Sequence, residues 1–406
     1  MQRLFLPLLF LLALGLASCE DEVSNIGAPY FSDTIGVRTD SVVIDGSARG
    51  ITMANYSLPA IPTNQLTYNA TAASSTLFLG KAENGALEAW PVLRFPVLQT
   101  DTLDRVKSVT LQLKVVPYMH GAKVTSTDFA VYVEGAGKIN EATTSLTMSD
   151  LSANSFGVHT AELPDSSGWV VSITLDSAIR TQLRAASTSL VLVPGNMTNV
   201  RAFGSTEITD AKFHPQLEFT YMDGTTEKKT YRKPLLDMTI VKRTNTHSAD
   251  QLFVAGGSND RVAINFQPDS VQIDRFSAVN SAILRLKLDP AHSSIGMNTR
   301  DTLGPAVVFK NFQAQADSGA AFIAYGVKSS VAADTWDFQI RDVIELWLDD
   351  PTTNFGFELR AGYATRTIGG NLIITEDYSL NRWTFFGPAG APADRPQLII
   401  ISSSLK

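Results

Sequence analysis

Hydrophobic and polar residues alternate strictly in two segments of this sequence, 111–115 and 284–288. In each segment leucine or valine occupies every second position, and glutamine, lysine or arginine stands between them. A hydrophobic residue followed by Asp and Arg precedes each segment, at 103–105 and 273–275. A period of two residues predicts a strand with one buried and one solvated face. Such strands are typical of antiparallel sheets, because parallel sheets are buried on both faces.

The sequence around these two segments also recurs in a constant order. Three further pairs of blocks match at a nearly constant offset: 77–80 with 252–255, 175–183 with 340–348, and 215–219 with 396–400. This pattern indicates a tandem duplication, and many short strand patterns separated by turn residues favour a sandwich or barrel. We therefore expect an all-β chain of two tandem antiparallel jelly-roll β-sandwich domains, at 31–222 and 231–406, joined by a linker at 223–230.

Each half contains one segment whose hydrophobic residues follow a helical period. In 175–183 and in 340–348 they fall at i, i+3, i+4, i+7 and i+8, which predicts an amphipathic helix of about two turns. Pro351 follows the second segment and is expected to end its helix. Because so short a helix is marginal alone, we expect one in each domain, packed on the sheet.

The first 18 residues have the features of an export signal. Arg3 gives a positive start, and the apolar run at 4–16 is too short for a stable membrane anchor. The run ends in Leu-Ala-Ser before Cys19, which is similar to a bacterial lipobox, where the signal is cut before a cysteine that receives a diacylglycerol. We expect a lipoprotein signal peptide at 1–18 and membrane attachment through a lipid on Cys19. The alternative is an ordinary signal peptide followed by a chance cysteine.

Residues 19–30 are expected to form an acidic tether. Glu20, Asp21 and Glu22 resemble the surface-export signal of Bacteroidota-type lipoproteins, which predicts an outer-membrane protein displayed at the cell surface. The alternative is a solvated acidic linker. Cys19 is the only cysteine, so internal disulfides are excluded. A formal net charge of −7 offers no basic field for nucleic acid.

The order of these patterns resembles DNRLRE-type modules. The resemblance is carried by five stretches: Leu-Arg-Phe at 93–95, the alternating strand at 111–115, the Ile-to-Trp helix pattern at 340–347, Asn-Phe-Gly-Phe-Glu-Leu at 354–359, and Pro-Gln-Leu at 396–398. It implies jelly-roll sandwiches, some of which are carbohydrate-binding modules acting on polyuronates such as alginate. The first half departs from the pattern because it lacks the helix tryptophan and the Asn-Phe-Gly strand. The second half has Asn265 where these modules commonly have arginine.

Signatures of catalysis and of metal binding are absent from the sequence. None of the five histidines stands four residues from another, and no His-Glu-x-x-His motif occurs. The Ser-x-x-Lys at 403–406 lies at the end of the chain and is a chance match. No catalytic residue, metal site or cofactor is expected, although a structural calcium held by loop carboxylates remains open.

Two tryptophans are candidates for stacking on sugar rings, because they stand among polar residues near predicted loops. Sugar rings pack on exposed aromatic faces while polar side chains bind their hydroxyls. Trp90 precedes a predicted strand, and Trp383 stands in a polar stretch with other candidate ligands. The favoured site is this second stretch, whose members are Tyr378, Asn381, Arg382 and Trp383. The alternative for both tryptophans is a half-buried structural role.

The remaining aromatic and basic residues complete the candidate set. Trp169, Trp336 and Trp347 fit strand or helix faces and are expected in the core. For an anionic ligand, Arg94, Arg285 and Arg382 could pair with its carboxylates.

Three classes of function stay open on the sequence. The first is a non-catalytic surface lipoprotein that binds glycans, including anionic polysaccharide, or mediates adhesion. The second is an accessory envelope lipoprotein that binds a protein partner and shows a large apolar patch. The third is an enzyme of polysaccharide metabolism, with a cleft that holds acid and base groups of shifted pKa.

Overall fold

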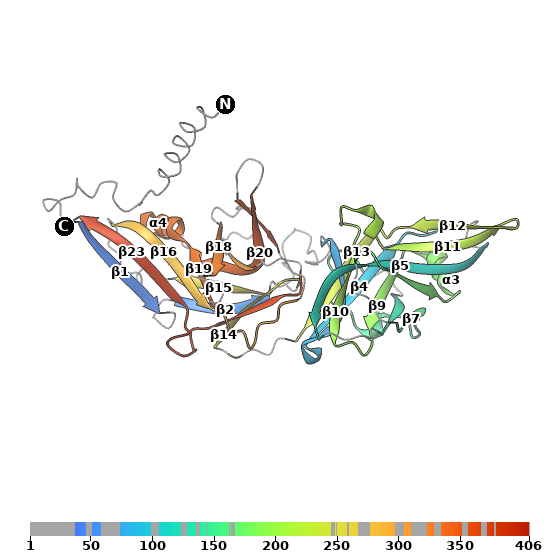
Figure 1. Cartoon of the computed structure of the whole chain (residues 1–406), viewed down its shortest axis with the longest axis horizontal. Coiled ribbons are helices and arrows are strands. Elements are labelled where there is room, and N and C mark those ends of the chain that lie inside the picture. The colour runs from blue at the N-terminus through green and yellow to red at the C-terminus, as the bar shows by residue number, and fades with distance from the viewer. Residues whose placement is uncertain are drawn as a thin grey trace, which may run out of the picture.

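The strands of this computed structural model form two separate ladders, each of which defines one unit of the chain. The structure describes residues 37–45, 51–57, 74–98, 105–122, 128–134, 139–143, 145–161, 163, 167–244, 248, 250–257, 260–266, 277–296, 304–309, 323–328, 334–350, 356–366, 372–376 and 379–405. The two units follow each other along the longest axis of the molecule (Figure 1).

The first unit is continuous in sequence. It contains β3 (Thr76–Ala82), β4 (Leu87–Phe95), β5 (Val106–Gly121), β6 (Phe129–Glu134), β7 (Gly157–His159), β8 (Val170–Leu175), β9 (Thr188–Pro194), β10 (Asn199–Gly204), β11 (Gln216–Asp223), β12 (Thr226–Arg232), β13 (Leu236–Arg243), the helix α3 (Ile179–Ala185) and the 3-10 turns η2 (Glu83–Gly85), η3 (Met148–Asp150) and η4 (Ala211–Phe213). Its ladder runs β12-β11-β5-β10-β3-β4-β9-β6-β7, with β13 beside β4 and β8 beside β5.

The second unit is assembled from two separate parts of the chain. It contains β1 (Val37–Asp45), β2 (Ile51–Ser57), β14 (Gln251–Ala255), β15 (Asp260–Phe266), β16 (Ala278–Lys287), β17 (Gly304–Phe309), β18 (Ile323–Lys328), β19 (Thr335–Gln339), β20 (Phe357–Arg366), β21 (Leu372–Glu376), β22 (Arg382–Phe386), β23 (Gln397–Leu405) and the helix α4 (Arg341–Asp349). Its ladder runs β1-β23-β16-β19-β18-β17-β20-β15-β14-β22, with β2 beside β15 and β21 beside β20.

These large antiparallel sheets confirm the all-β expectation, and the described residues place one α-helix in each unit. The two alternating segments lie in equivalent strands. β5 pairs with β8 and β11, and β16 pairs with β19 and β23, so each has the strand before the helix on one side and the last strand of its repeat on the other. The jelly-roll topology of each unit stays a prediction.

The leading strands of the two repeats are exchanged between the units. β1 and β2 precede the first repeat in sequence but pair with β23 and β15 of the second unit. β12 and β13 precede the second repeat but pair with β11 and β4 of the first unit. β4 and β15 occupy equivalent places in the two repeats, as do β11 and β23. Each unit therefore contains one pair of leading strands, but these strands precede the other repeat in the sequence. Pulling the units apart therefore requires strands to leave both sheets.

This exchange corrects the domain boundaries that the sequence suggested. Residues 37–57 lie in the second unit rather than in a domain at 31–222, and β13 lies in the first unit rather than in one at 231–406. The expected linker at 223–230 is part of a hairpin: it comprises the last residue of β11, the turn and most of β12, and Asp223 pairs with Thr226. Periodicity could not reveal this, because it predicts which residues form a strand and which face is buried, but not the partner strand.

Each unit has its own hydrophobic core, built by the alternation that the sequence shows. Leu111, Leu113 and Val115 of β5 are buried among side chains of the first unit. Leu284 and Leu286 of β16 are buried in the second unit, where α4 contributes Val343, Ile344 and Trp347. Burial of each such side chain contributes about 1.5–3 kcal/mol to the free energy of unfolding. With a single cysteine in the sequence, no internal disulfide adds to this stability.

Gly80 in β3 brings β3 and β10 unusually close. Its φ is +143°, and a Cβ at this position would lie 2.0 Å from the carbonyl oxygen of Asn199. Because that atom belongs to the backbone of β10, no side-chain movement could relieve the clash, and only glycine fits. The close pairing fixes the end of β3, and the η2 turn that follows directly begins at Glu83.

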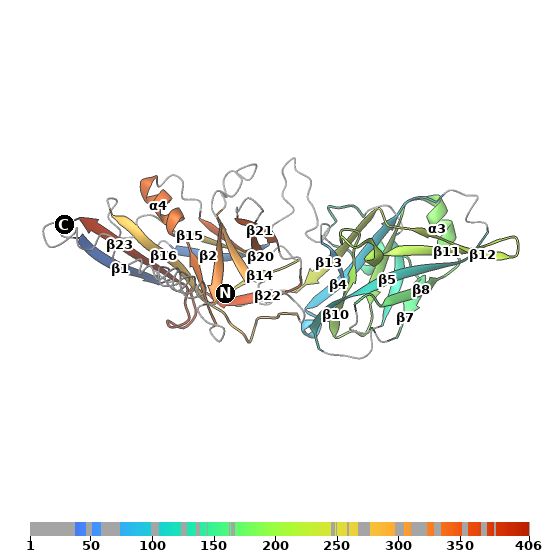
Figure 2. The same cartoon turned by 45° about the horizontal axis from the view of Figure 1, so that its top comes forward.

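The two ends of the described chain lie at the same end of the molecule. β1 pairs with β23 along its whole length, so that Val37 lies opposite Leu405. The hairpin of β11 and β12 lies at the opposite end of the long axis, as both views show (Figures 1 and 2). The second unit is therefore the one nearest to the chain that precedes residue 37.

Candidate functional site

The favoured sequence site lies at the junction between the two units and not on an exposed loop. Asn381 and Trp383 are each 1% exposed. Trp383 stands in β22 opposite Val254 of β14, and its ring lies in the core of the second unit. The expected exposure of this ring is therefore wrong, because a strand begins at Arg382 where the polar sequence suggested a loop. Tyr378 and Cys19 lie outside the described residues.

Trp90 is also buried, at 3% exposure, so the same correction applies to it. Its ring lies in a cluster with Val92, Met238 and Ile240, where β13 covers β4. The Lys242 ammonium lies 3.1 Å from the ring centroid, which closes one face of the indole. Neither ring has a face that a sugar could reach, and we do not propose them as a binding site.

The remaining tryptophans divide differently from expectation. Trp336 and Trp347 are buried, at 8% and 5% exposure, as the sequence predicts. Trp169 is 56% exposed, so its expected place in the core is wrong. It stands immediately before β8, where its carbonyl accepts from the Val115 N–H at 2.9 Å, at the end of the strand and outside the buried core.

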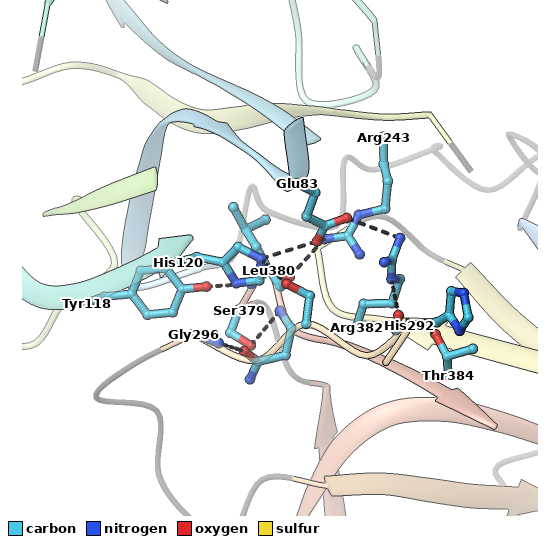
Figure 3. Close-up of polar contacts among 12 residues, drawn as sticks. Glu83, Tyr118, His120, Arg243, His292, Gly296, Ser379, Leu380, Arg382 and Thr384 are labelled. Carbon is cyan, nitrogen blue, oxygen red and sulfur yellow. Dashed lines mark hydrogen bonds and ion pairs between the residues drawn. The ribbon is translucent and has the colours of Figure 1, made fainter. Parts of the chain in front are cut away.

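The junction is held by charged side chains from both units (Figure 3). Glu83 of the η2 turn contacts three groups: Arg382 of the second unit at 3.1 Å, His120 at 3.2 Å and Arg243 at 3.6 Å. Burial, the largest influence, raises the pKa of the Glu83 carboxyl. The hydrogen bond with His120 and the charges of Arg243 and Arg382 outweigh it, and the pKa falls to about 2. Glu83 is therefore an anion at neutral pH.

An apolar contact lies beside these charges. Leu380 of the second unit is fully buried in a cluster of first-unit side chains that includes Phe78 and Tyr118. The Leu380 backbone N–H donates to the Tyr118 hydroxyl at 3.2 Å, and Arg243 donates to the Leu380 carbonyl at 2.8 Å. A Cβ on Gly296 would lie 2.9 Å from the same hydroxyl, so the second unit approaches closely here. These contacts fix the two units in one orientation.

Ser294, His120 and Glu83 have the residue types of a catalytic triad but not its geometry. In a triad the serine and the acid contact different ring nitrogens of the histidine. Here both contact Nε2, Ser294 Oγ at 2.9 Å and Glu83 Oε1 at 3.2 Å. Because ionised Glu83 can only accept, Nε2 must carry the hydrogen and cannot take a proton from Ser294. These contacts support the joint between the units and not a nucleophile.

A second group of polar residues lies on the outer face of β8, β5, β11 and β12 in the first unit. We call this surface the distal face, since it belongs to the unit farther from β1. Its members alternate with core residues and stand opposite one another in the strand register: Ser172 and Thr174 of β8, Thr110, Gln112 and Lys114 of β5, Gln216, Glu218 and Thr220 of β11, and Lys229 and Tyr231 of β12. The sequence predicts Gln112 and Lys114 of β5 to be solvated, but not their partners.

Hydrogen bonds connect the centre of the distal face across three strands. The Gln216 amide donates to Gln112 at 2.8 Å, and the Gln112 amide donates to Glu218 at 2.8 Å. Lys229 donates to the other oxygen of Glu218, also at 2.8 Å. The network therefore holds both amides and the carboxylate in one arrangement, which lowers the entropy that a ligand must remove.

Exposed side chains stand at both sides of this network. Tyr231 is 45% exposed and lies opposite Glu218 on the edge strand β12. Val170, which is 41% exposed, stands opposite Lys114 at the start of β8 on the other side. Sequence reasoning missed Tyr231, because the basic residues around it read as a linker. The sequence feature that could have revealed it is the Asp-Gly turn at 223–224, which predicts a hairpin whose second strand would contain Tyr231.

Comparisons with known proteins add little to this geometry. No model of a protein family matches the sequence, and no curated protein matches it. Among solved structures, the chain is similar to a crystal structure of a protein of Parabacteroides distasonis ATCC 8503 that is described as secreted. The identity is 10% and the TM-score 0.23, over 89% of this chain and 99% of that chain. So distant a likeness carries no argument.

Two searches of the described residues complete the picture. No helix among them is long and apolar enough to cross a membrane. Nor does this part of the chain bring together three or more histidine, cysteine, aspartate or glutamate side chains that could hold a metal ion.

Proposed function

We propose that this chain is a non-catalytic, lipid-anchored protein of the outer membrane that holds a polysaccharide-binding face away from the cell. The lipobox-like sequence before Cys19 and the acidic residues after it support the anchor and the location. The observation that carries the proposal is the pairing of β1 with β23, because the chain that leaves Cys19 enters the second unit first. The distal face then belongs to the unit that lies farther from β1 along the molecule (Figure 1).

The junction supports the proposal that the distal face is held away from the cell. If the two units were joined flexibly, the first unit would not keep a fixed direction relative to the second. The Glu83 ion pairs, the buried Leu380 and the exchanged strands together join the units as one rigid body. Rigid presentation is the use that these contacts best support, since the triad-like cluster lacks catalytic geometry.

Accessory binding of a protein partner is less well supported. A partner surface is expected to be a contiguous apolar patch of several hundred Å². The exposed large hydrophobic residues of the described chain come instead from separate elements, including Val43 of β1, Val158 of β7 and Leu235 before β13.

Intact cells provide the test of this function. Cells that produce the protein are incubated with fluorescently labelled β-glucan, xylan, mannan, alginate and polygalacturonate. We expect them to retain at least one polymer above the level of cells without the gene. Cells producing Cys19→Ala should lose this retention and release the protein from the membrane fraction. Retention equal to that of cells without the protein, for every polymer, would contradict the proposal.

A further inference from the structure

The two charges at the centre of the distal face, those of Glu218 and Lys229, compensate each other. Glu218 is 7% exposed and is the carboxylate at its centre. Burial raises the pKa of Glu218, but the hydrogen bond and charge of Lys229, with hydrogen bonds from Tyr231 and Gln112, leave it below its ordinary value. Glu218 is thus ionised at neutral pH and is paired with the Lys229 ammonium at 2.8 Å. A charged sugar acid would have to compete with this pair.

The arginines that the sequence offered for an anionic ligand are occupied by the protein. Arg285 forms two hydrogen bonds of 2.8 Å with Asp337, a bidentate pair. Arg94 donates to the Ser187 hydroxyl and to a backbone carbonyl at 139. Arg382 is paired with Glu83 in the junction. None of the three lies on the distal face, so a polyuronate would find no guanidinium fork there. Lys114 is the one cation of this face, among the described residues, that lies outside the Glu218–Lys229 pair.

The same face offers neutral hydrogen-bonding groups in rows across the strands. Ser172, Gln112 and Gln216 stand side by side on β8, β5 and β11. Each amide has two N–H donors and a carbonyl with two lone pairs, and the network uses only some of them. Among the described residues, each of these glutamine amides donates one hydrogen bond, so a second N–H remains for a ligand. Fixed amides beside hydroxyl side chains suit the hydroxyl groups of an uncharged sugar.

Building on the proposed function, we infer that the distal face is the ligand site and that it takes a neutral polysaccharide rather than a polyuronate. The polymer lies across the four strands, with its hydroxyls on Gln112 and Gln216. The exposed ring of Tyr231 packs against a sugar face at the β12 edge, and Val170 offers apolar surface at the other side.

The test uses the chain from residue 20, which retains every described residue, in affinity gels that contain one polymer each. The polymers are the neutral β-glucan, xylan and mannan, and the anionic alginate and polygalacturonate. We expect at least one neutral polymer to retard the protein, and neither anionic polymer to do so. Tyr231→Ala should weaken that binding about tenfold, and Gln112→Ala about fivefold. The control is Thr230→Ala, on the opposite face of β12, and thermal melting verifies that each variant is folded.

The outcomes separate this inference from the proposed function. Retardation by a neutral polymer that both variants weaken supports the site and the ligand class. Retardation that the folded variants leave unchanged overturns the site, and retardation by polyuronates alone overturns the ligand class, while the proposed function survives both. No retardation by any of the five polymers overturns the proposed function as well.

Discussion

Arg382 and Glu83 form an ion pair across the two units of this chain, with 3.1 Å between Nη1 and Oε2. The arginine begins β22 of the second unit, and the glutamate begins the η2 turn of the first. Their side chains are only 20% and 10% exposed, so water screens the pair little. The same carboxylate also faces Arg243, whose side chain is 1% exposed. Glu83 therefore holds together one buried cation, Arg243, and one largely shielded cation, Arg382.

Replacing Glu83 by Gln should destabilise the junction strongly. The amide keeps the shape of the carboxyl group but leaves Arg243 and Arg382 facing each other without an anion. Removal of one partner from a buried pair reduces the free energy of unfolding by about 3–5 kcal/mol. Urea unfolding measures this. The control is Lys81→Ala, which breaks the more exposed Lys81–Glu88 pair on the adjacent strands and should change stability by less than about 1 kcal/mol. Equal effects of the two changes would contradict the buried role of Glu83.

Acid should loosen the junction over a defined pH range. The pKa of Glu83 is about 2 in the folded chain, against an ordinary value of 4.5. Between these values the unfolded chain binds more protons than the folded one, so stability falls as the pH falls from about 4.5 to 2. The contribution of Glu83 is about 3 kcal/mol above this range. The wild type should therefore lose its advantage over Glu83→Gln between pH 4.5 and 2. A constant difference across that range would exclude this titration.

Leu380 tests the apolar half of the junction without altering any charge. Leu380→Ala removes a fully buried side chain from the first-unit cluster and should reduce the free energy of unfolding by about 2–5 kcal/mol. Because the contact joins the units, we also expect faster proteolysis of the connection at 244–250. Leu235→Ala is the matched control, since Leu235 is 70% exposed and should be nearly neutral. A neutral Leu380→Ala would contradict the rigid joint.

The strands could be predicted from local sequence, because one-sided burial imposes a period of two on each strand. The segments 111–115 and 284–288 lie in equivalent strands. The stripe at 340–348 became α4, whereas that at 175–183 starts in β8 at Leu175 and is helical only from Ile179, in α3. Strand partners could not be predicted. β1 pairs with β23 and β12 pairs with the equivalent strand β11. Because the two partner strands are equivalent, only the three-dimensional arrangement decides which unit each leading strand joins.

The candidate site shows a similar limit. Trp383 stands beside Asn381 and Arg382 in a polar stretch, which is typical of an exposed loop. In the structure that polarity serves the buried contacts between the units, since Arg382 meets Glu83 and the Asn381 carboxamide accepts from the Gly296 N–H. A sequence cannot separate a polar residue that faces solvent from one that faces another part of the same chain. The distal face was missed for a related reason, since its members come from four strands.

The most direct test of the central claim, that the anchored chain holds its first unit outward, is cysteine labelling on intact cells. Cys19 is the only cysteine, and its thiol is blocked by the proposed lipid, so one added cysteine is the sole reactive thiol. Thr226→Cys places it on the distal hairpin, and Ala278→Cys places it beside the C-terminal end of β23. Both positions are exposed, and a small maleimide on detergent-solubilised protein normalises their reactivity. A bulky polyethylene-glycol maleimide should label Thr226→Cys several-fold more than Ala278→Cys. Equal labelling, the reverse order, or no labelling at either position would contradict the account.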